Sequence, residues 1–250
     1  MQLVVDNGNT STKVAVFTDT GEIVVQYNWQ RPTKKQYAAL LQSYVLDAAI
    51  VCSVGAMAAE LVEWLQQSIP FVILLDEHTP LPIKNAYATP QTLGYDRLAV
   101  AVGANAMHRN TPILIIDAGT AITYEFVSDD NTYIGGNIAP GVTMRLRALH
   151  DYTHKLPLLV PDLSTVDKGI VGDDTQSAMQ LGILQGMVYE IEGYIAALKA
   201  QFPSLLIFLT GGDAFFFERR LKSSIFVSPN LLLSGLHCIL QYNKCLQTEQ

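Results

Sequence analysis

Two short segments of the chain carry the same pattern of residues suited to holding a phosphate group and its cation. Residues 4–17 read VVDNGNTSTKVAVF, and residues 115–126 read IIDAGTAITYEF. In each, an apolar run ends at an aspartate, Asp6 or Asp117, and passes through a glycine-bearing turn with hydroxyl side chains into a second β-rich run. Such a turn brings backbone N–H groups and a cation-binding carboxylate to one place. The repeat predicts two similar domains that hold one nucleotide, as in a kinase or an ATPase.

The glycines and hydroxyl groups of the two turns explain why this pattern suits phosphate oxygens. Gly8 and Gly119 allow the backbone to approach a phosphate without an intervening Cβ. Hydroxyl groups that can donate to the same oxygens belong to Thr10, Ser11, Thr12 and Thr120. Either pattern alone also fits an ordinary hairpin turn, because Asp and Gly are common turn residues. The matching flanks favour the functional interpretation, and neither segment is a Walker loop or a dinucleotide fingerprint.

A third segment, Gly94-Tyr95-Asp96-Arg97, stands before a predicted helix. Phosphoryl transfer to an alcohol benefits from a carboxylate that orients the hydroxyl and accepts its proton late in the transition state. Asp96 could fill this role, and Arg97 could pair with a carboxylate or phosphate of the ligand. The alternative is that Asp96 caps the helix and Arg97 pairs at the surface.

Two further glycine-rich segments leave both a structural and a functional interpretation open. The loop at 135–141 reads GGNIAPG, and Gly211-Gly212 follows an apolar strand pattern. Each could bring the backbone close to a ligand, or could only pack two elements closely.

Composition excludes several classes of protein. The 250 residues are 49% hydrophobic and 16% charged, which suits a large core or an extensive subunit interface. Sixteen basic and 23 acidic residues give a net charge of −7, and no basic stripe is present, so we expect no nucleic-acid partner. Three cysteines are too few for a disulfide framework or a zinc site. Without a leader pattern or a membrane-spanning apolar run, we expect no membrane partner and a cytoplasmic location.

The order of elements predicts the fold class, an α/β protein with two domains, at residues 1–111 and 112–250. Each half begins with three successive strand patterns that are then interleaved with helices, which indicates a mixed sheet covered by helices. The predicted strands are 2–6, 12–18, 22–28, 47–53, 71–75, 113–117, 121–128, 132–138 and 205–209. The predicted helices are 34–43, 56–68, 97–108, 142–149, 174–200 and 229–246, with Asp174 or Thr175 as the cap of the long one.

Taken together, the motifs resemble those of the type III pantothenate kinases, in that family's order and at its spacing. The resemblance runs from Met1 to about His237. The matching segments are DNGNT (6–10), GYDR (94–97), DAGTA (117–121), GGNIAPG (135–141), DDTQSAMQLGI (173–183) and TGGDA (210–214). The resemblance implies the actin-like, sugar-kinase-like ATPase superfamily, with two ribonuclease-H-like domains facing each other across a nucleotide cleft. It also implies the reaction of ATP with pantothenate to give 4′-phosphopantothenate and ADP, the first step of coenzyme A synthesis.

The same resemblance assigns roles to individual residues. The implied ATP contacts are Asp6, Asn7, Gly8, Asn9, Thr10, Ser11, Thr12, Lys13 and Thr120. The implied pantothenate contacts are Tyr87, Gly94, Tyr95, Asp96, Arg97 and Thr175, with Asp96 as the general base. The implied cations are Mg²⁺ with ATP, held near Asp6 directly or through water, and a monovalent cation (K⁺ or NH₄⁺) at Asp117. Family members are homodimers in which the second subunit completes the pantothenate pocket.

Two other functions compete with the kinase. Some members of the family are named as accessory factors for transcription, so the chain could be a catalytically silent regulator. The negative charge and the presence of Asp6, Asp96 and Asp117 speak against that. The acceptor could also be a sugar or glycerol, and the segments GYDR and GGNIAPG favour pantothenate only through the resemblance.

Overall fold

The computed structural model describes residues 1–8, 11–53 and 59–248. Contacts divide the chain into two compact units. The N-terminal unit comprises residues 1–109, 131–133 and 230–250, and the C-terminal unit comprises 110–130 and 134–229. This grouping differs from a single boundary after residue 111, because the last helix packs on the sheet of the N-terminal unit.

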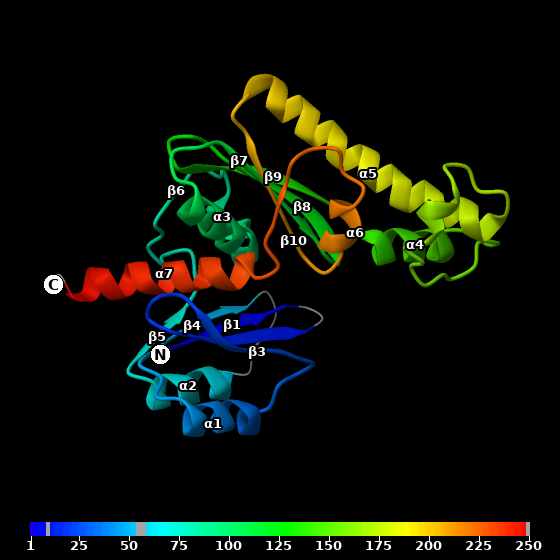
Figure 1. Ribbon diagram of the computed structural model, residues 1–250. Coiled ribbons are helices and arrows are strands. Elements are labelled where there is room, and N and C mark those ends of the chain that lie inside the picture. The colour runs from blue at the N-terminus through cyan, green and yellow to red at the C-terminus, as the bar shows by residue number, and fades with distance from the viewer. Residues whose placement is uncertain (9–10, 54–58, 249–250) are drawn as a thin grey trace. The chain divides into compact units, whose positions relative to one another are not determined.

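The N-terminal unit is built on a five-stranded mixed sheet in the order β3-β2-β1-β4-β5 (Figure 1). Strands β1, β2 and β3 are antiparallel neighbours, and β4 and β5 run parallel to β1. The five strands of this sheet are β1 (Gln2–Asn7), β2 (Thr12–Phe17), β3 (Ile23–Trp29), β4 (Ala48–Ser53) and β5 (Phe71–Leu74). The unit also contains the short strand β6 (Lys84–Asn85), which is not part of this sheet. Its helices are α1 (Lys34–Ser43), α2 (Ala59–Ser68), the 3₁₀ turn η1 (Pro90–Thr92), α3 (Tyr95–Met107) and α7 (Leu231–Thr248).

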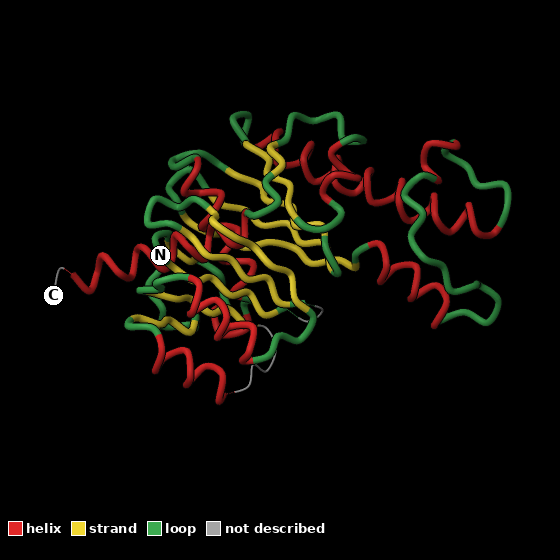
Figure 2. The backbone as a smooth tube through the Cα atoms, turned by 60° about the horizontal axis from the view of Figure 1, so that its bottom comes forward, coloured by secondary structure: helices red, strands yellow, loops and turns green. Residues whose placement is uncertain are grey.

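Helices cover both faces of this sheet. On one face, α1 and α2 close a core that includes Leu3, Val5, Tyr37 and Leu65, all nearly inaccessible to solvent. On the other face, α7 lies against β1, β2 and β4, and α3 packs on α7 (Figures 1 and 2). The two helices can cross closely because Gly235 has no side chain. A Cβ at this position would collide with the α3 backbone. The glycine therefore brings the start of α3 into a fixed position relative to the sheet.

The C-terminal unit repeats the plan with its own mixed sheet, in the order β11-β10-β7-β8-β9. Strands β7 and β8 are antiparallel, while β10 runs parallel to both β7 and β11. Its strands are β7 (Ile113–Ala118), β8 (Ala121–Val127), β9 (Thr132–Pro140), β10 (Leu206–Thr210) and β11 (Phe226–Val227). Its helices are α4 (Val142–Asp151), the 3₁₀ turn η2 (Thr165–Lys168), α5 (Thr175–Gln201) and α6 (Ala214–Glu218). The first two residues of β9 pair with β6 and group with the N-terminal unit.

The core of the C-terminal unit lies between this sheet and the helices α4, α5 and α6. The long helix α5 contributes Leu184, Met187, Ile191 and Ile195, which meet apolar side chains of β7, β8 and β10. Asp174 is the N-cap of α5, and its carboxylate accepts from the backbone N–H groups two and three residues on. The predicted cap position is therefore occupied by Asp174 rather than by Thr175.

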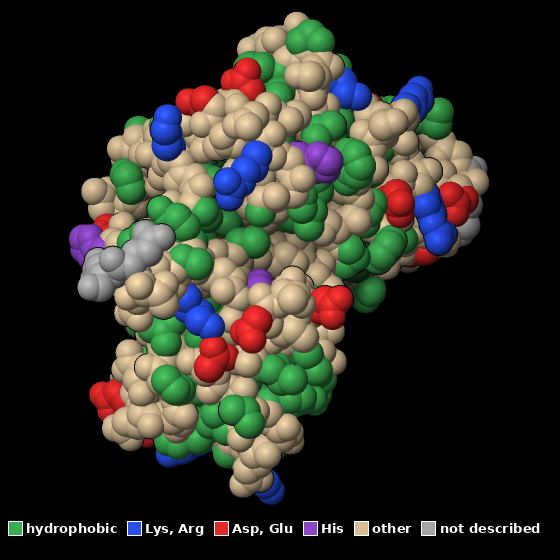
Figure 3. Space-filling model, turned by 60° about the vertical axis from the view of Figure 1, so that its left-hand side comes forward, with side chains coloured by type: hydrophobic (Ala, Val, Ile, Leu, Met, Phe, Trp, Pro, Cys, Tyr) green, Lys and Arg blue, Asp and Glu red, His purple; other side chains and the backbone are tan. Residues whose placement is uncertain are grey.

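Most predicted elements are present within a few residues of their predicted bounds, and the α/β class with two mixed sheets is confirmed. The sequence did not predict β6, β11 or the 3₁₀ turns, which are four residues long or shorter. Residues 56–58 of the predicted helix 56–68 lie outside the described residues. Among the described residues, no helix has the length and apolar character needed to cross a membrane. On the face drawn in Figure 3, acidic and basic side chains are interspersed with hydrophobic ones.

Candidate active site

The first Asp-Gly turn is a hairpin between β1 and β2 whose base is held by an asparagine. Asn7 Nδ2 donates to Ser53 Oγ at 3.0 Å, and Thr12 Oγ1 donates to Asn7 Oδ1 at 2.9 Å. The Gly8 N–H donates to the Ser11 carbonyl at 3.1 Å and closes the turn. The buried Thr12 hydroxyl therefore stabilises the hairpin in this structure.

The loop between these residues contains part of the predicted ATP contact. Asn9 and Thr10 lie outside the described residues. Lys13 is partly exposed and pairs in register with Asp6 across β1 and β2.

Two carboxylates of the predicted site, Asp6 and Asp96, both lie near the buried thiol of Cys52 in the N-terminal unit. Asp6 ends β1 and is only 6% exposed, and its neighbour in the parallel strand β4 is Cys52. Burial raises the pKa of the Cys52 thiol, and the negative charges of Asp6 and Asp96 raise it further. Asp96 comes from α3, 90 residues after Asp6 in the chain. The fold thus brings the end of β1, the end of β4 and the start of α3 to one place.

Asp96 lies in the first turn of α3, whose N-cap is Gly94. Its Oδ1 accepts from the backbone N–H of Arg97 at 2.9 Å. A Cβ at Gly94 would crowd the same carboxylate oxygen, so the glycine leaves Asp96 its position. The carboxylate is half-buried, and it also offsets the positive end of the helix dipole. A capping contribution and a chemical role are therefore compatible at this residue.

Arg97 is a buried residue rather than a surface partner, with 7% of its area exposed. Its guanidinium carbon lies 5.6 Å from the centre of the Tyr87 ring, a cation–π contact. The Tyr87 ring centre lies 6.2 Å from that of the buried Tyr133. The structure therefore joins two of the predicted pantothenate contacts, Tyr87 and Arg97, and adds Tyr133, which the motifs did not indicate.

Tyr95, the residue at the variable position of GYDR, lies near the connector that precedes α3. Burial raises the pKa of its hydroxyl, and the carboxylates of Glu77 and Asp76 raise it further. Tyr95 is thus near two acidic residues.

In the C-terminal unit, three glycine-rich loops meet around the end of β7. Asp117 ends this strand, and the Gly119 N–H closes the following turn by donating to the Ala121 carbonyl at 3.0 Å. Gly211, with φ +95°, leaves no room for a Cβ against Ala118 and the Asp117 carboxylate. Gly141 lies against Gly119, and its N–H donates to the Thr120 carbonyl at 3.1 Å. Close packing therefore explains these glycines, and it surrounds Asp117 with backbone.

A partly buried ion pair fixes the loop that ends in Gly141. Arg145 Nη2 donates to Glu190 Oε2 at 2.7 Å, and Arg145 Nε donates to the Pro140 carbonyl at 2.7 Å. The hydroxyl of Tyr124 donates to Glu190 Oε1 at 2.8 Å. The motifs did not indicate this network, because its members come from β8, α4 and α5. It connects the long helix to the turn that carries Thr120.

Thr120 and Thr175, the two predicted contacts in the C-terminal unit, are both exposed. Thr175 is the first residue of α5. Next to it, a cavity of about 580 Å³ is lined mainly by residues before and within the first turns of the helix, including Asp173, Asp174 and Ser177.

The carboxylates of the two Asp-Gly turns are of the kind that binds a cation together with a nucleotide. Within the described part of the chain, no group of three or more His, Cys, Asp and Glu side chains is arranged to hold a metal ion. Mg²⁺ in kinases is commonly bound by one or two carboxylates together with substrate phosphates and water. Asp6 and Asp117, each at the end of a central strand beside a glycine turn, supply carboxylates of this kind.

Comparisons with known proteins agree with the motifs. The sequence model of the family described as type III pantothenate kinase matches residues 2–197. A type III pantothenate kinase of Bacteroides fragilis is 46% identical over 243 residues, which is 97% of this chain and 98% of that protein.

Solved structures show the same fold at low sequence identity. A Campylobacter jejuni protein, assigned provisionally to the Baf family of transcriptional activators, has a TM-score of 0.59 at 20% identity, covering 97% of this chain and 99% of that one. A Sinorhizobium meliloti protein, assigned provisionally as a 2-dehydro-3-deoxygalactonokinase, has a TM-score of 0.57 at 13% identity, with coverage of 97% and 99%. These likenesses show an actin-like, sugar-kinase-like fold, and the sequence matches show that the chain belongs to the type III pantothenate kinases.

Proposed function

We propose that this protein transfers the γ-phosphoryl group of ATP to the 4′-hydroxyl of pantothenate, the first step of coenzyme A synthesis. The observation that carries the proposal is that β1 and β4 pair Asp6 with Cys52 and that the helix of Asp96 packs on β4, in a chain of this family. One carboxylate sits beside a glycine turn suited to phosphate, and the other begins a helix next to a buried arginine. A kinase needs these two groups near each other.

Asp96 is the proposed general base. Its carboxylate orients the acceptor hydroxyl and takes up the proton as the bond to phosphorus forms, late in a loose transition state. The bond to the Arg97 N–H uses one lone pair of Oδ1 and leaves the other oxygen for the substrate. The half-buried position of the carboxylate and its bond to the helix N–H limit its motion.

Arg97 and Tyr87 are the proposed anchors of the pantothenate carboxylate. A buried guanidinium favours a carboxylate partner strongly, because its charge is poorly solvated. The cation–π contact with Tyr87 holds the guanidinium beside this ring. Gly94 and Tyr95 are further proposed pantothenate contacts of the same segment, and Thr175, the first residue of α5, is also a proposed pantothenate contact.

The two Asp-Gly turns are the proposed phosphate sites. Since the Gly8 and Gly119 N–H groups close their own turns, the phosphate contacts fall to the other loop groups, including Ser11, Lys13 and Thr120. We propose that Asp6 holds Mg²⁺, directly or through water, and that Asp117 holds a monovalent cation, K⁺ or NH₄⁺. A bound cation neutralises charge that builds up on the phosphate oxygens.

We further propose that the protein works as a homodimer whose second subunit completes the pantothenate pocket. In the segment between α4 and α5, apolar side chains are exposed over most of their area: 62% at Leu158, 83% at Val160, 70% at Ile170 and 86% at Val171. Apolar side chains grouped this way commonly mark a protein interface. A cytoplasmic location is proposed because ATP is the donor and the three cysteines are free.

The test is ADP release by the purified protein with ATP, Mg²⁺ and K⁺, with and without pantothenate. Release that depends on pantothenate, and that falls sharply in Asp96→Asn, supports the proposal. If the folded protein releases ADP only with a sugar or glycerol, the acceptor is wrong. If no acceptor supports release, the chain is the catalytically silent regulator.

A further inference from the structure

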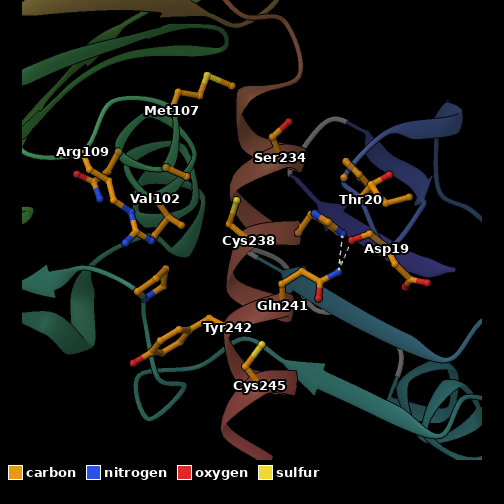
Figure 4. A pocket seen from close by; sticks show the side chains of 16 residues that line it. Asp19, Thr20, Val102, Met107, Arg109, Ser234, Cys238, Gln241, Tyr242 and Cys245 are labelled. Atoms are coloured by element: carbon orange, nitrogen blue, oxygen red, sulfur yellow. Dashed lines mark hydrogen bonds between the residues drawn. The ribbon is translucent and has the colours of Figure 1, made fainter. Parts of the chain in front are cut away.

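The N-terminal unit contains a cavity of about 530 Å³ that the proposed kinase site does not use. Helix α7 runs along its length and forms its floor (Figure 4). Ser234, Cys238, Gln241 and Cys245 are spaced by four, three and four residues, so they lie along one face of the helix. The walls come from the end of α3, from Arg109 and from the turn after β2 that contains Asp19 and Thr20.

This cavity is separate from the GYDR segment along α3. Asp96 lies in the first turn of the helix, whereas Val102, Asn105 and Met107 at its other end line the cavity. Nine residues of helix separate Asp96 from Asn105, which is a distance of roughly 13 Å at 1.5 Å per residue. The two sites therefore share a helix but no lining residue.

One buried group in the wall lacks a partner. The Oδ1 atom of Asn105 accepts no hydrogen bond, although the residue is only 3% exposed and lines the cavity. An amide oxygen left unsatisfied in a buried position is costly, and such groups are rare in folded proteins. The oxygen is closed to solvent in this structure, so a ligand with an N–H or O–H donor would satisfy it once the amide group turns toward the cavity.

The rim of the cavity carries one positive and one negative side chain, Arg109 and Asp19, and the positive charge is the one that acts on the floor. Burial raises the pKa of the Cys238 thiol, while the Arg109 guanidinium lowers it, so Arg109 is close enough to affect the floor. The Asp19 carboxylate accepts from Gln2 Nε2 at 2.9 Å. Apolar walls are supplied by Phe17, Pro82, Val102 and Met107.

We propose that this cavity binds a small organic anion that has an apolar body and one N–H or O–H donor. The anionic group pairs with Arg109, the donor reaches Asn105 Oδ1, and the apolar body lies on the α7 floor. The volume is in the range that holds small-molecule ligands, about 300–1,000 Å³. The four floor residues extend along roughly 16 Å of helix, which favours an elongated molecule.

The test uses N-hexanoylglycine, which has a carboxylate, an amide N–H and a short apolar chain. Binding to the full-length protein is measured by calorimetry with pantothenate and a non-hydrolysable ATP analogue present at saturation, so that the substrate pocket is filled. We expect one site per chain and binding at least fivefold weaker for the neutral analogue N-hexanoylglycinamide, since the charge-assisted hydrogen bond to Arg109 is lost.

Three variants locate the site. Arg109→Met should weaken binding about fivefold, while Arg147→Met, which removes the same charge from an exposed position on α4, should not change it. Asn105→Leu removes the unpaired acceptor and should weaken binding several-fold. Met107 is 50% exposed, so Met107→Trp should fold normally and should block binding by filling the cavity.

The proposal is overturned by any of three results. The probe shows no binding at millimolar concentration, or the neutral analogue binds as tightly as the acid. Alternatively, Arg109→Met and Met107→Trp both bind like the parent, which would place the probe elsewhere.

Discussion

Replacing Glu190 tests whether the ion pair behind the second phosphate turn holds that turn in place. In Glu190→Ala, the Tyr124 hydroxyl loses its acceptor although Tyr124 is 2% exposed, a cost of about 1–3 kcal/mol. Arg145, whose side chain is 22% exposed, loses an ion pair worth about 1 kcal/mol after screening by solvent. The expected loss is therefore about 2–4 kcal/mol in the free energy of unfolding.

A chain of this size shifts its melting temperature by about 2–4 °C per kcal/mol, so we expect a decrease of about 5–15 °C. Glu190→Gln keeps an acceptor for Tyr124 and loses only the charge, so its decrease should be less than half as large. Thermal unfolding followed by circular dichroism measures both, with Glu218→Ala at an exposed position of α6 as the matched control.

The same variant should also raise the KM for ATP at a temperature at which it is fully folded. Arg145 holds the Pro140 carbonyl, and the neighbouring Gly141 donates to Thr120, the proposed ATP contact. If Glu190→Ala melts within 2 °C of Glu218→Ala and its KM for ATP is unchanged, the network does not position the turn and the reasoning is refuted.

Three other predictions concern the proposed site and the N-terminal core. Asp96→Asn should keep its fold and pantothenate binding, because the amide oxygen can still accept the helix N–H, while kcat falls by about 10²–10⁴; near-normal turnover would remove it as the base. Asp117→Ala should lose the rate increase that K⁺ gives the parent, and an unchanged response in steady-state assays would place the cation elsewhere. Burial lowers the pKa of His237 from 6.5, with Asp19 opposing the effect and Lys244 adding to it. The folded state therefore binds the proton less readily than the unfolded state, and stability should fall as the pH drops below about 6.5. His237→Phe, whose flat ring can still stack, should flatten this decrease in urea titrations, and an unaltered slope would assign it to another group.

The strands and long helices were predictable because their patterns are local. Runs such as VVD at β1 and IIDA at β7 are dense in β-branched residues and end at turn residues. The grouping of the chain was not predictable in this way. The sequence of α7 does not indicate that this helix packs on β1 and β4, since an apolar helix could cover either sheet.

The candidate site was likewise predictable only in part. The motifs placed Asp6 at a strand end and Asp96 at a helix start, and the structure has both there. The burial of Arg97 against Tyr87 could not be predicted, because the contact depends on how the long connector folds back over α3. The sequence presents Cys52 only as one of three scattered cysteines, yet it pairs in register with Asp6 and lies near Asp96.

The two Asp-Gly turns, so alike in sequence, are held by different means, and this difference bears on how each would treat a phosphate. The turn after Asp117 is surrounded by glycine backbone from two other loops, which leaves little freedom for it to move. Backbone packed this tightly resists displacement, because there is no side chain to rotate out of the way. The hairpin after Asp6 depends instead on the side chain of Asn7, which bridges two hydroxyl groups. Hydrogen bonds of this kind are individually worth about 0.5–1.5 kcal/mol and can be exchanged for bonds to a ligand. If both turns bind phosphate as proposed, we expect the second to act as a fixed site and the bonds of Asn7 at the base of the first to change when the nucleotide binds.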